Sequence, residues 1–222
     1  MEESVLRAPV SFLVFAASLR AASLNAKLAR LAAQEIEACG GQADLAAMRD
    51  FDCPSYDQDV QDSGKVPPGA VLFRERLERA DAFVICSPEY NFSMPGVLKN
   101  AIDWVSRMHP QPFNERHGLL MSVSPSLAGG NRGLWALRVP LEHLGARLYP
   151  EMFSLAQAGE AFTAGGDIAN PELRTRFADG IQGFMDLVEA AKHYPCTKRQ
   201  WIEFPGEPGL PAGQAARVKP GR

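Results

Sequence analysis

Continuous apolar runs and stretches with helical hydrophobic spacing alternate along most of this chain. Short apolar runs are typical of buried parallel strands, whereas apolar residues that recur every third or fourth position indicate amphipathic helices. Strands are predicted at 10–16, 43–48, 82–86 and 118–123, and a fifth within 146–155. Strands that alternate with helices predict an α/β fold with a parallel sheet and right-handed crossovers.

The predicted helices fill the segments between these strands. Ser23 is a good N-cap for the first, which carries Leu24, Leu28 and Leu31 on one face and ends at Gly40. The other apolar faces lie within 73–80, 98–105, 134–144 and 173–188. The polar stretch 49–68 has no clear period and is predicted to be a loop. Five strands favour the flavodoxin order 2-1-3-4-5 over the longer dinucleotide-binding order.

The end of the chain has a different composition. Prolines and glycines recur from Pro195 to Arg222 without helical or strand periodicity, which predicts irregular structure. We therefore expect one domain over 1–194 and a tail over 195–222. An apolar island at Trp201–Phe204 could lie across a neighbouring subunit rather than remain disordered.

Composition and charge narrow the possible partners. The 222 residues are 46% apolar and 22% charged, with a formal net charge of -3. These values are ordinary for a globular protein, and they provide no electrostatic attraction to nucleic acid or to an anionic membrane. Small molecules are the expected partners.

The cysteines and the N-terminus point to the cytoplasm. Cys39, Cys53, Cys86 and Cys196 are scattered, without the spacing of a zinc site or a disulfide framework. The first apolar run follows an acidic leader and Pro9, so a core strand explains it better than a signal peptide does. Because no apolar stretch approaches the roughly 20 residues that span a bilayer, we expect no membrane association.

Polar residues that suit a phosphate follow the first predicted strand. Ser18 and Ser23 offer hydroxyls, Arg20 a guanidinium and Asn25 an amide, beside the free N–H groups of a helix N-terminus. The loop lacks the glycine spacing of pyrophosphate sites and the Gly-Lys-Ser/Thr of a P-loop. A terminal phosphate monoester therefore fits it best. An ordinary helix cap beside a solvated arginine is the alternative on these residues alone.

The loop after the third predicted strand adds a longer motif. It reads Pro-Glu-Tyr-Asn-x-Ser-x-Pro-Gly-x-Leu-Lys-Asn-Ala-Ile-Asp-Trp over 88–104, and the first loop reads Ser-Leu-Arg-x-x-Ser-x-Asn over 18–25. Together these motifs resemble those of the NADPH-dependent FMN reductase family. The resemblance covers about residues 10–190 in organisation, although only these two stretches carry specific motifs.

This resemblance implies a flavodoxin-like fold that binds FMN. It assigns the FMN phosphate to Ser18, Arg20, Ser23 and Asn25. It places Pro88, Glu89, Tyr90 and Asn91 along the isoalloxazine ring, with a third contact from the loop that begins at Ser124. The sequence departs from the family at Ala17, where glycine is common, and at Pro125, which removes a backbone donor from a loop that is usually rich in glycine.

The resemblance also implies an activity. NADPH or NADH would give a hydride to N5 of FMN and leave, and a small acceptor such as a quinone, free flavin, azo compound or metal oxyanion would then take the electrons. No catalytic side chain or metal is expected, since the flavin carries the reactivity. Relatives of this kind are commonly homodimers or homotetramers.

Several motif residues are given structural roles. Glu89 and Tyr90 could form an acid/base pair, but shaping the flavin pocket is the better interpretation. Lys99 and Asp103, four residues apart on a helix, are expected to form a supporting ion pair. Trp104 and Trp135 are expected to lie in the core or at a subunit contact.

Two other functions remain open from the sequence. A flavodoxin-like electron carrier would bind FMN without taking hydride directly, but such carriers are usually strongly acidic and lack a guanidinium in the phosphate loop. A non-catalytic binding domain would have lost the cofactor, and the intact donors of the first loop argue against this.

Overall fold

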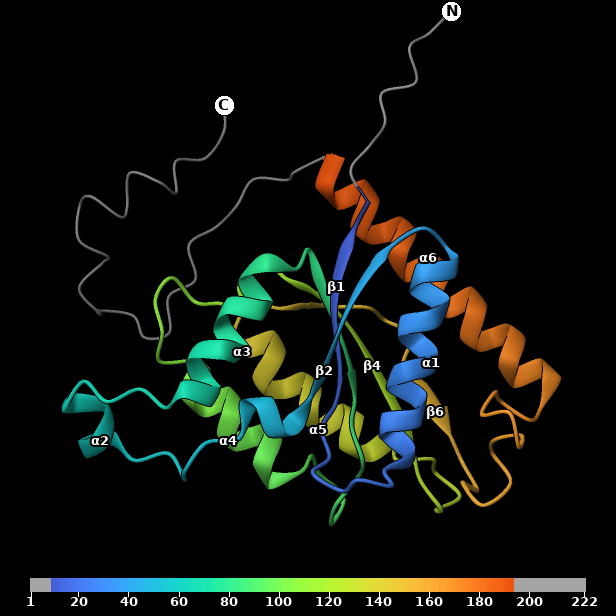
Figure 1. Cartoon of the computed structure of the whole chain (residues 1–222), viewed down its shortest axis with the longest axis horizontal. Helices are drawn as coiled ribbons and strands as arrows, with labels where there is room; N and C mark the ends of the chain where they lie inside the picture. Colours follow the sequence, from blue (N-terminus) through green and yellow to red (C-terminus); the bar gives the residue numbers. More distant parts are fainter. Residues whose placement is uncertain (1–8, 194–222) are drawn as a thin grey trace, which may run out of the picture.

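The computed structural model describes residues 9–193, which form a parallel sheet with helices on both faces (Figure 1). The sheet order is β2-β1-β3-β4-β5, and β6 also pairs with β4. The strands are β1 (Ser11–Ala16), β2 (Gln42–Ala47), β3 (Ala82–Cys86), β4 (His117–Val123), β5 (Arg147–Leu148) and β6 (Phe153–Leu155). The pairings of these strands are parallel. The predicted flavodoxin-like α/β fold is therefore confirmed.

The helices separate into two layers. Figure 1 shows α1 and α6 on one face of the sheet and α3, α4 and α5 on the other. Their bounds are α1 (Leu24–Ala38), α2 (Gln58–Asp62), α3 (Pro68–Arg79), α4 (Gly96–Val105), α5 (Asn131–His143) and α6 (Pro171–His193). The predicted N-cap is confirmed, because the Ser23 hydroxyl accepts a hydrogen bond from the Ala26 N–H at 3.3 Å.

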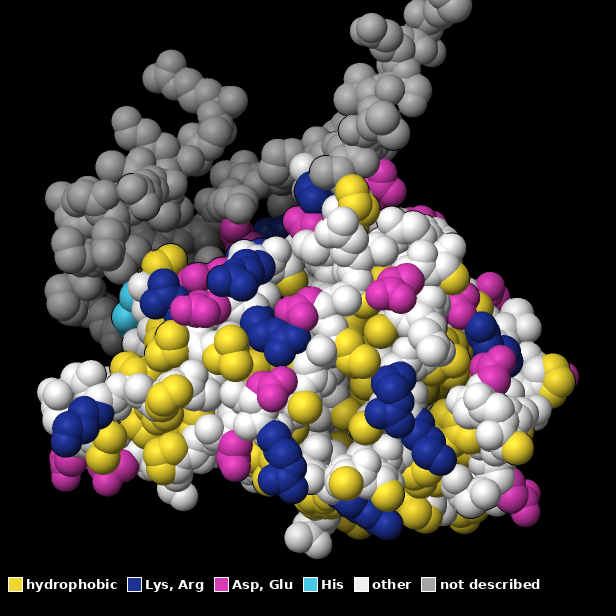
Figure 2. All heavy atoms as spheres, in the orientation of Figure 1, with side chains coloured by type: hydrophobic (Ala, Val, Ile, Leu, Met, Phe, Trp, Pro, Cys, Tyr) yellow, Lys and Arg dark blue, Asp and Glu magenta, His cyan; other side chains and the backbone are white. Residues whose placement is uncertain are grey.

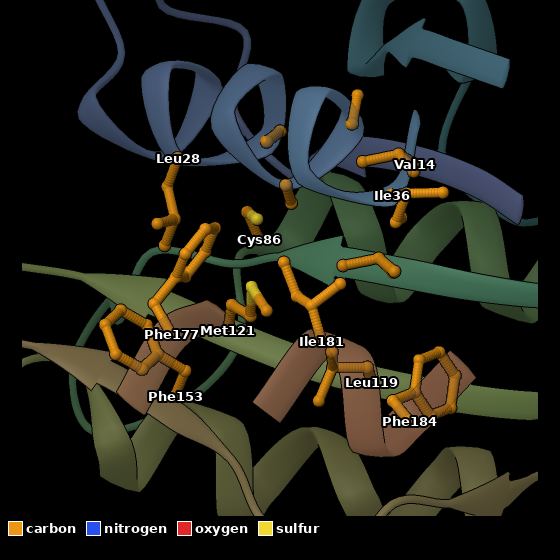
Figure 3. Packing of buried hydrophobic residues seen from close by; sticks show 14 of the residues in the cluster. Val14, Leu28, Ile36, Cys86, Leu119, Met121, Phe153, Phe177, Ile181 and Phe184 are labelled. Carbon is orange, nitrogen blue, oxygen red and sulfur yellow. The ribbon is translucent and has the colours of Figure 1, made fainter. Parts of the chain in front are cut away.

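Alternation along β1 divides the core between the two faces. Phe12 and Val14 belong to the apolar cluster under α1 and α6, whereas Leu13 and Phe15 belong to the cluster on the opposite face. Figure 3 shows the first cluster, in which side chains of α6 such as Ile181 meet residues of the central strands. A strand buried on both faces explains why β1 is a continuous apolar run.

The fifth strand of the prediction is two strands in the structure. β5 pairs with the start of β4, and β6 pairs with its end, at Met121 and Phe153. Pro150 lies between the two pieces and has no N–H to donate to a ladder, so the pairing is interrupted there. The expected count of five strands is thus replaced by six, although the strand order is unchanged.

The prediction of a loop at 49–68 was incomplete. A 3₁₀ helix, η1 (Met48–Phe51), starts this region, and α2 lies within it. Phe51 is fully buried and stacks on Phe73 of α3 at 4.5 Å between ring centroids. A helix this short is stabilised by tertiary packing. Its own sequence is too short to show a period from which the helix could be predicted.

Two residues of the 88–104 motif hold this region against α4. Asn100 donates to the carbonyls of Cys53 and Pro54 and accepts from the Tyr56 N–H, and the Trp104 indole N–H donates to Pro54. Trp104 is also buried within the apolar cluster on this face, so it is a core residue, as one of the two expectations for it stated. Part of the motif thus anchors the 53–56 segment to α4.

Some of the expectations concern membrane spans and the C-terminal tail. None of the helices within residues 9–193 is long and apolar enough to cross a membrane. The expected tail at 195–222, its apolar island at 201–204 and Cys196 lie outside the described residues.

Candidate functional site

Three loops leave the sheet together at the carboxyl ends of β1, β3 and β4, along the lower edge of Figure 1. Backbone hydrogen bonds continue the sheet into them: Ala17 donates to Cys86 at 2.9 Å, and Ser87 donates to Met121 at 2.8 Å. The strand order reverses between β1 and β3, and open α/β sheets bind ligands at that point. The two loops singled out from the sequence therefore lie side by side.

The β1–α1 loop presents donors that suit a phosphate. Arg20 is exposed, and its backbone N–H donates to the Ser18 hydroxyl at 3.3 Å. Ser23 caps the Ala26 N–H, whereas the N–H groups of Leu24 and Asn25 lie in the first turn of α1 and have no intrahelical carbonyl to bond. A guanidinium beside hydroxyls and a helix N-terminus is a favourable environment for a dianion.

Asn25 joins the start of α1 to the sheet. Its side chain is buried, its amide donates to the Val123 carbonyl at 3.0 Å, and its amide oxygen accepts from the Val123 N–H at 3.0 Å. Both ends of the amide therefore join α1 to the end of β4. This residue positions the β1–α1 loop relative to the sheet.

A tight turn projects from the β3–α4 loop. Tyr90 and Ser93 exchange backbone hydrogen bonds of 2.9 and 3.0 Å across Asn91 and Phe92. Both central residues have positive φ, 50° for Asn91 and 63° for Phe92. Asparagine tolerates this left-handed conformation, but an aromatic residue adopts it rarely, so the turn stores backbone strain at its tip.

Arg132, at the start of α5, holds this loop and was missed by the sequence analysis. Its guanidinium lies 2.8 Å from the Glu89 carboxylate and 3.6 Å from the centroid of the Phe92 ring. Gly133 donates its N–H to the second carboxylate oxygen of Glu89 at 3.1 Å. An opposite charge 43 residues away gives no local signal in the sequence.

The environment of Glu89 keeps it ionised. Burial raises the pKa of this carboxyl, but the hydrogen bonds from Arg132 and Gly133 and the charge of Arg132 outweigh burial, so its pKa lies below the ordinary value. A carboxylate held in this way supports the loop and is a poor general acid.

The β4–α5 loop completes the edge with close backbone packing. Ser124 donates its N–H to Leu155 at 3.1 Å, and its hydroxyl accepts from the Ser126 N–H at 3.2 Å. Gly130 has a φ of 86°, and a Cβ there would lie 2.0 Å from the Ser122 hydroxyl. Glycine is therefore required beside the strand end, and the turn survives the presence of Pro125.

The other candidate residues lie away from a shared centre. Lys99 and Asp103 form the expected ion pair at 2.6 Å, whereas Trp135 is 57% exposed on α5. Among residues 9–193, no group of three or more His, Cys, Asp or Glu side chains could hold a metal ion. Desolvation raises the pKa of the fully buried Cys86 thiol, which makes it unreactive.

Comparisons of the sequence with known proteins identify a family of reductases. The sequence profile of the family described as NADPH-dependent FMN reductase matches residues 10–160. A quinone reductase of Escherichia coli K12 is 38% identical over 183 residues, which cover 79% of this chain and 93% of that protein. An NAD(P)H-dependent FMN reductase of Pseudomonas aeruginosa is 37% identical over 131 residues, 58% of this chain and 70% of that protein.

A solved structure extends the similarity to three dimensions. The flavoenzyme NAD(P)H:(acceptor) oxidoreductase of Paracoccus denitrificans superposes with a TM-score of 0.71 at 28% identity. The match covers 82% of this chain and 98% of that one. The similarity thus extends over most of this chain and nearly all of that one.

Proposed function

The chain belongs to the NADPH-dependent FMN reductase family, and from this premise we propose that it is an FMN-dependent NAD(P)H oxidoreductase that reduces a small acceptor. One observation carries the assignment of the site. The phosphate-type donors of the β1–α1 loop and the 88–91 segment lie together at the strand switch between β1 and β3. An elongated ligand with a phosphate at one end and a flat ring at the other matches that edge.

The donors of the first loop make different contributions to phosphate binding. Arg20 supplies charge, Ser18 and Ser23 supply hydroxyls, and the N–H groups at the start of α1 complete the set. Asn25 acts indirectly, because its hydrogen bonds to Val123 fix the position of the start of α1. We propose it as a positioning residue and not as a direct phosphate ligand.

The remaining two loops enclose the ring. Pro88, Glu89, Tyr90 and Asn91 offer backbone groups along one side, and Ser124 begins the loop on the other. Arg132 keeps the first of these loops in place through Glu89. FMN held there would supply the hydride- and electron-transfer chemistry. The protein contributes position, electrostatics and exclusion of water.

A quinone is the acceptor that we favour, because the E. coli relative named above is a quinone reductase and matches over most of its length. Both NADPH and NADH remain candidate donors for this chain.

The purified protein tests this function directly. A reductase will have the absorption bands of bound FMN and will oxidise NADPH or NADH when a benzoquinone is added. Protein that binds FMN but leaves both nucleotides unoxidised would be an electron carrier. Protein that remains colourless after incubation with FMN would be a non-catalytic domain, and either result contradicts the proposal.

We also propose a homodimer or homotetramer that works in the cytoplasm. Trp135 and Val139, one turn apart on α5, are 57% and 70% exposed, and Leu127 before this helix is 85% exposed. Apolar side chains exposed on one helix face suit a subunit contact. The free thiols of Cys39, Cys53 and Cys86 suit a reducing compartment. Light scattering on Trp135→Asp should show a smaller assembly than the native protein.

A further inference from the structure

A pocket of about 420 Å³ lies on the β2 side of the phosphate loop, away from the proposed ring site. Its volume is within the range of small-ligand sites, roughly 300 to 1,000 Å³. Ala26 and Ala29 of α1 and Leu45 of β2 provide apolar walls, and Leu45 is 44% exposed. β2 is an edge strand, so this side of the sheet is open to an incoming molecule.

Three arginines line the same pocket, namely Arg20, Arg30 and Arg49. Asp50 is the acidic residue of the lining, and its carboxylate is already engaged by the Ala47 N–H at 3.0 Å and by Arg76 at 3.4 Å. The pocket therefore carries excess positive charge. Figure 2 shows dark blue side chains gathered beside α1 and below β2 on this face.

The pocket is continuous with the proposed phosphate site. Ser18, Leu19, Arg20 and Ala21 belong to both, and Arg49 donates to the Leu19 carbonyl at 3.0 Å. A group that extends past the FMN phosphate, or a nucleotide that lies across it, would thus enter this pocket. Apolar walls with a cationic rim suit a flat base that carries a phosphate.

From this arrangement we infer that the pocket binds the phosphorylated adenosine half of a dinucleotide. The inference rests on the proposed function and adds a second subsite to it. Two dinucleotides could bring such a phosphate to Arg30: NADPH, through the adenosine 2′-phosphate that NADH lacks, and FAD, through the adenylate attached to the flavin phosphate. Arg30 is the residue of choice for the test, because it lines the pocket without belonging to the phosphate loop.

The experiment compares Arg30→Ala with Lys27→Ala, which removes an exposed cation from the same helix outside the pocket lining. Adenosine 2′,5′-bisphosphate is titrated into the FMN-loaded protein by calorimetry, and FAD and FMN are titrated into the apoprotein by fluorescence. Arg30→Ala should lose a charge-assisted contact, so the dissociation constant of one of the two adenosine ligands should rise about tenfold. FMN affinity and NADH oxidation should be the same in both variants and in the native protein.

The two arms identify the source of the adenosine. Weaker binding of the bisphosphate indicates NADPH, and weaker binding of FAD at unchanged FMN affinity indicates FAD. Equal affinities of Arg30→Ala and Lys27→Ala for both ligands, in protein that binds FMN and oxidises NADH, would overturn the inference while leaving the proposed function intact. A Leu45→Glu variant, which places a negative charge in the pocket wall, should reproduce the weakening and serves as a second test.

Discussion

The guanidinium of Arg132 lies 2.8 Å from the carboxylate of Glu89, and this pair joins the first turn of α5 to the loop that follows β3. The Glu89 side chain is only 8% exposed, whereas that of Arg132 is 42% exposed. Gly133 allows the approach, since a Cβ there would lie 3.1 Å from the backbone of Glu89. This pair thus fixes the loop after β3, which forms one side of the proposed ring pocket, against the start of α5.

Glu89→Gln should destabilise the protein in a pH-dependent manner. The folded protein lowers the pKa of Glu89, so the ionised carboxylate stabilises the fold above its unfolded pKa of about 4.3. This contribution is lost as the pH falls through the lower folded pKa. We expect a loss of about 1–2 kcal/mol at pH 7, which shrinks at pH 4 and below. Urea unfolding of the apoprotein at the two pH values measures it.

Glu160→Gln is the matched control, because Glu160 is exposed and its side chain lies outside the Arg132 contact. It should change the unfolding free energy little at either pH. A Glu89→Gln protein as stable as native at pH 7 would show that the ion pair contributes nothing to the fold.

Arg20→Ala should weaken FMN binding about ten- to a hundredfold. A charge-assisted contact to a phosphate is worth roughly 1.5–3 kcal/mol, and this arginine is the cation within the loop of residues 18–25. Fluorescence titration of the apoprotein at low salt gives the dissociation constant. Arg79→Ala, an exposed change at the end of α3, should bind FMN like the native protein. Equal affinity of the two variants argues against the phosphate site.

Asn25→Ala should destabilise the apoprotein by about 2–4 kcal/mol. The change leaves the buried N–H and carbonyl of Val123 without their partners, and each unsatisfied group costs about 1–3 kcal/mol. Chemical denaturation without FMN measures the effect, with exposed Gln34→Ala on the same helix as control. If stability were unchanged and only FMN affinity fell, Asn25 would be a direct ligand.

Asn91→Leu should lower NADPH oxidation and shift the flavin absorption bands, because it places a bulky side chain beside the ring and disfavours a φ of 50°. Asn91→Gly tolerates the same backbone conformation and separates the two causes. Steady-state kinetics and absorption spectra of both variants, loaded with FMN, provide the measurement. Native spectra and rates in Asn91→Leu would place the ring elsewhere.

The local features of this protein follow from its sequence. Apolar runs predicted β1, β3 and β4, the Ser23 cap predicted the start of α1, and the motif at 88–104 indicated the family. These signals are short in range: a strand buried on both faces must be apolar throughout, and a helix start needs a side-chain acceptor. The ion pair of Lys99 and Asp103 was predictable for the same reason.

Contacts between distant segments were decided only by the tertiary structure. Phe51 forms part of a 3₁₀ helix because Phe15 and Phe73 enclose it. The Asn25 amide bonds to Val123, 98 residues away, a partner that no local pattern indicates. Arg132 and the pocket beside β2 also depend on segments that meet only in the folded chain. A residue type states which interactions a side chain can make, whereas the competition among partners brought together by folding determines which one it makes.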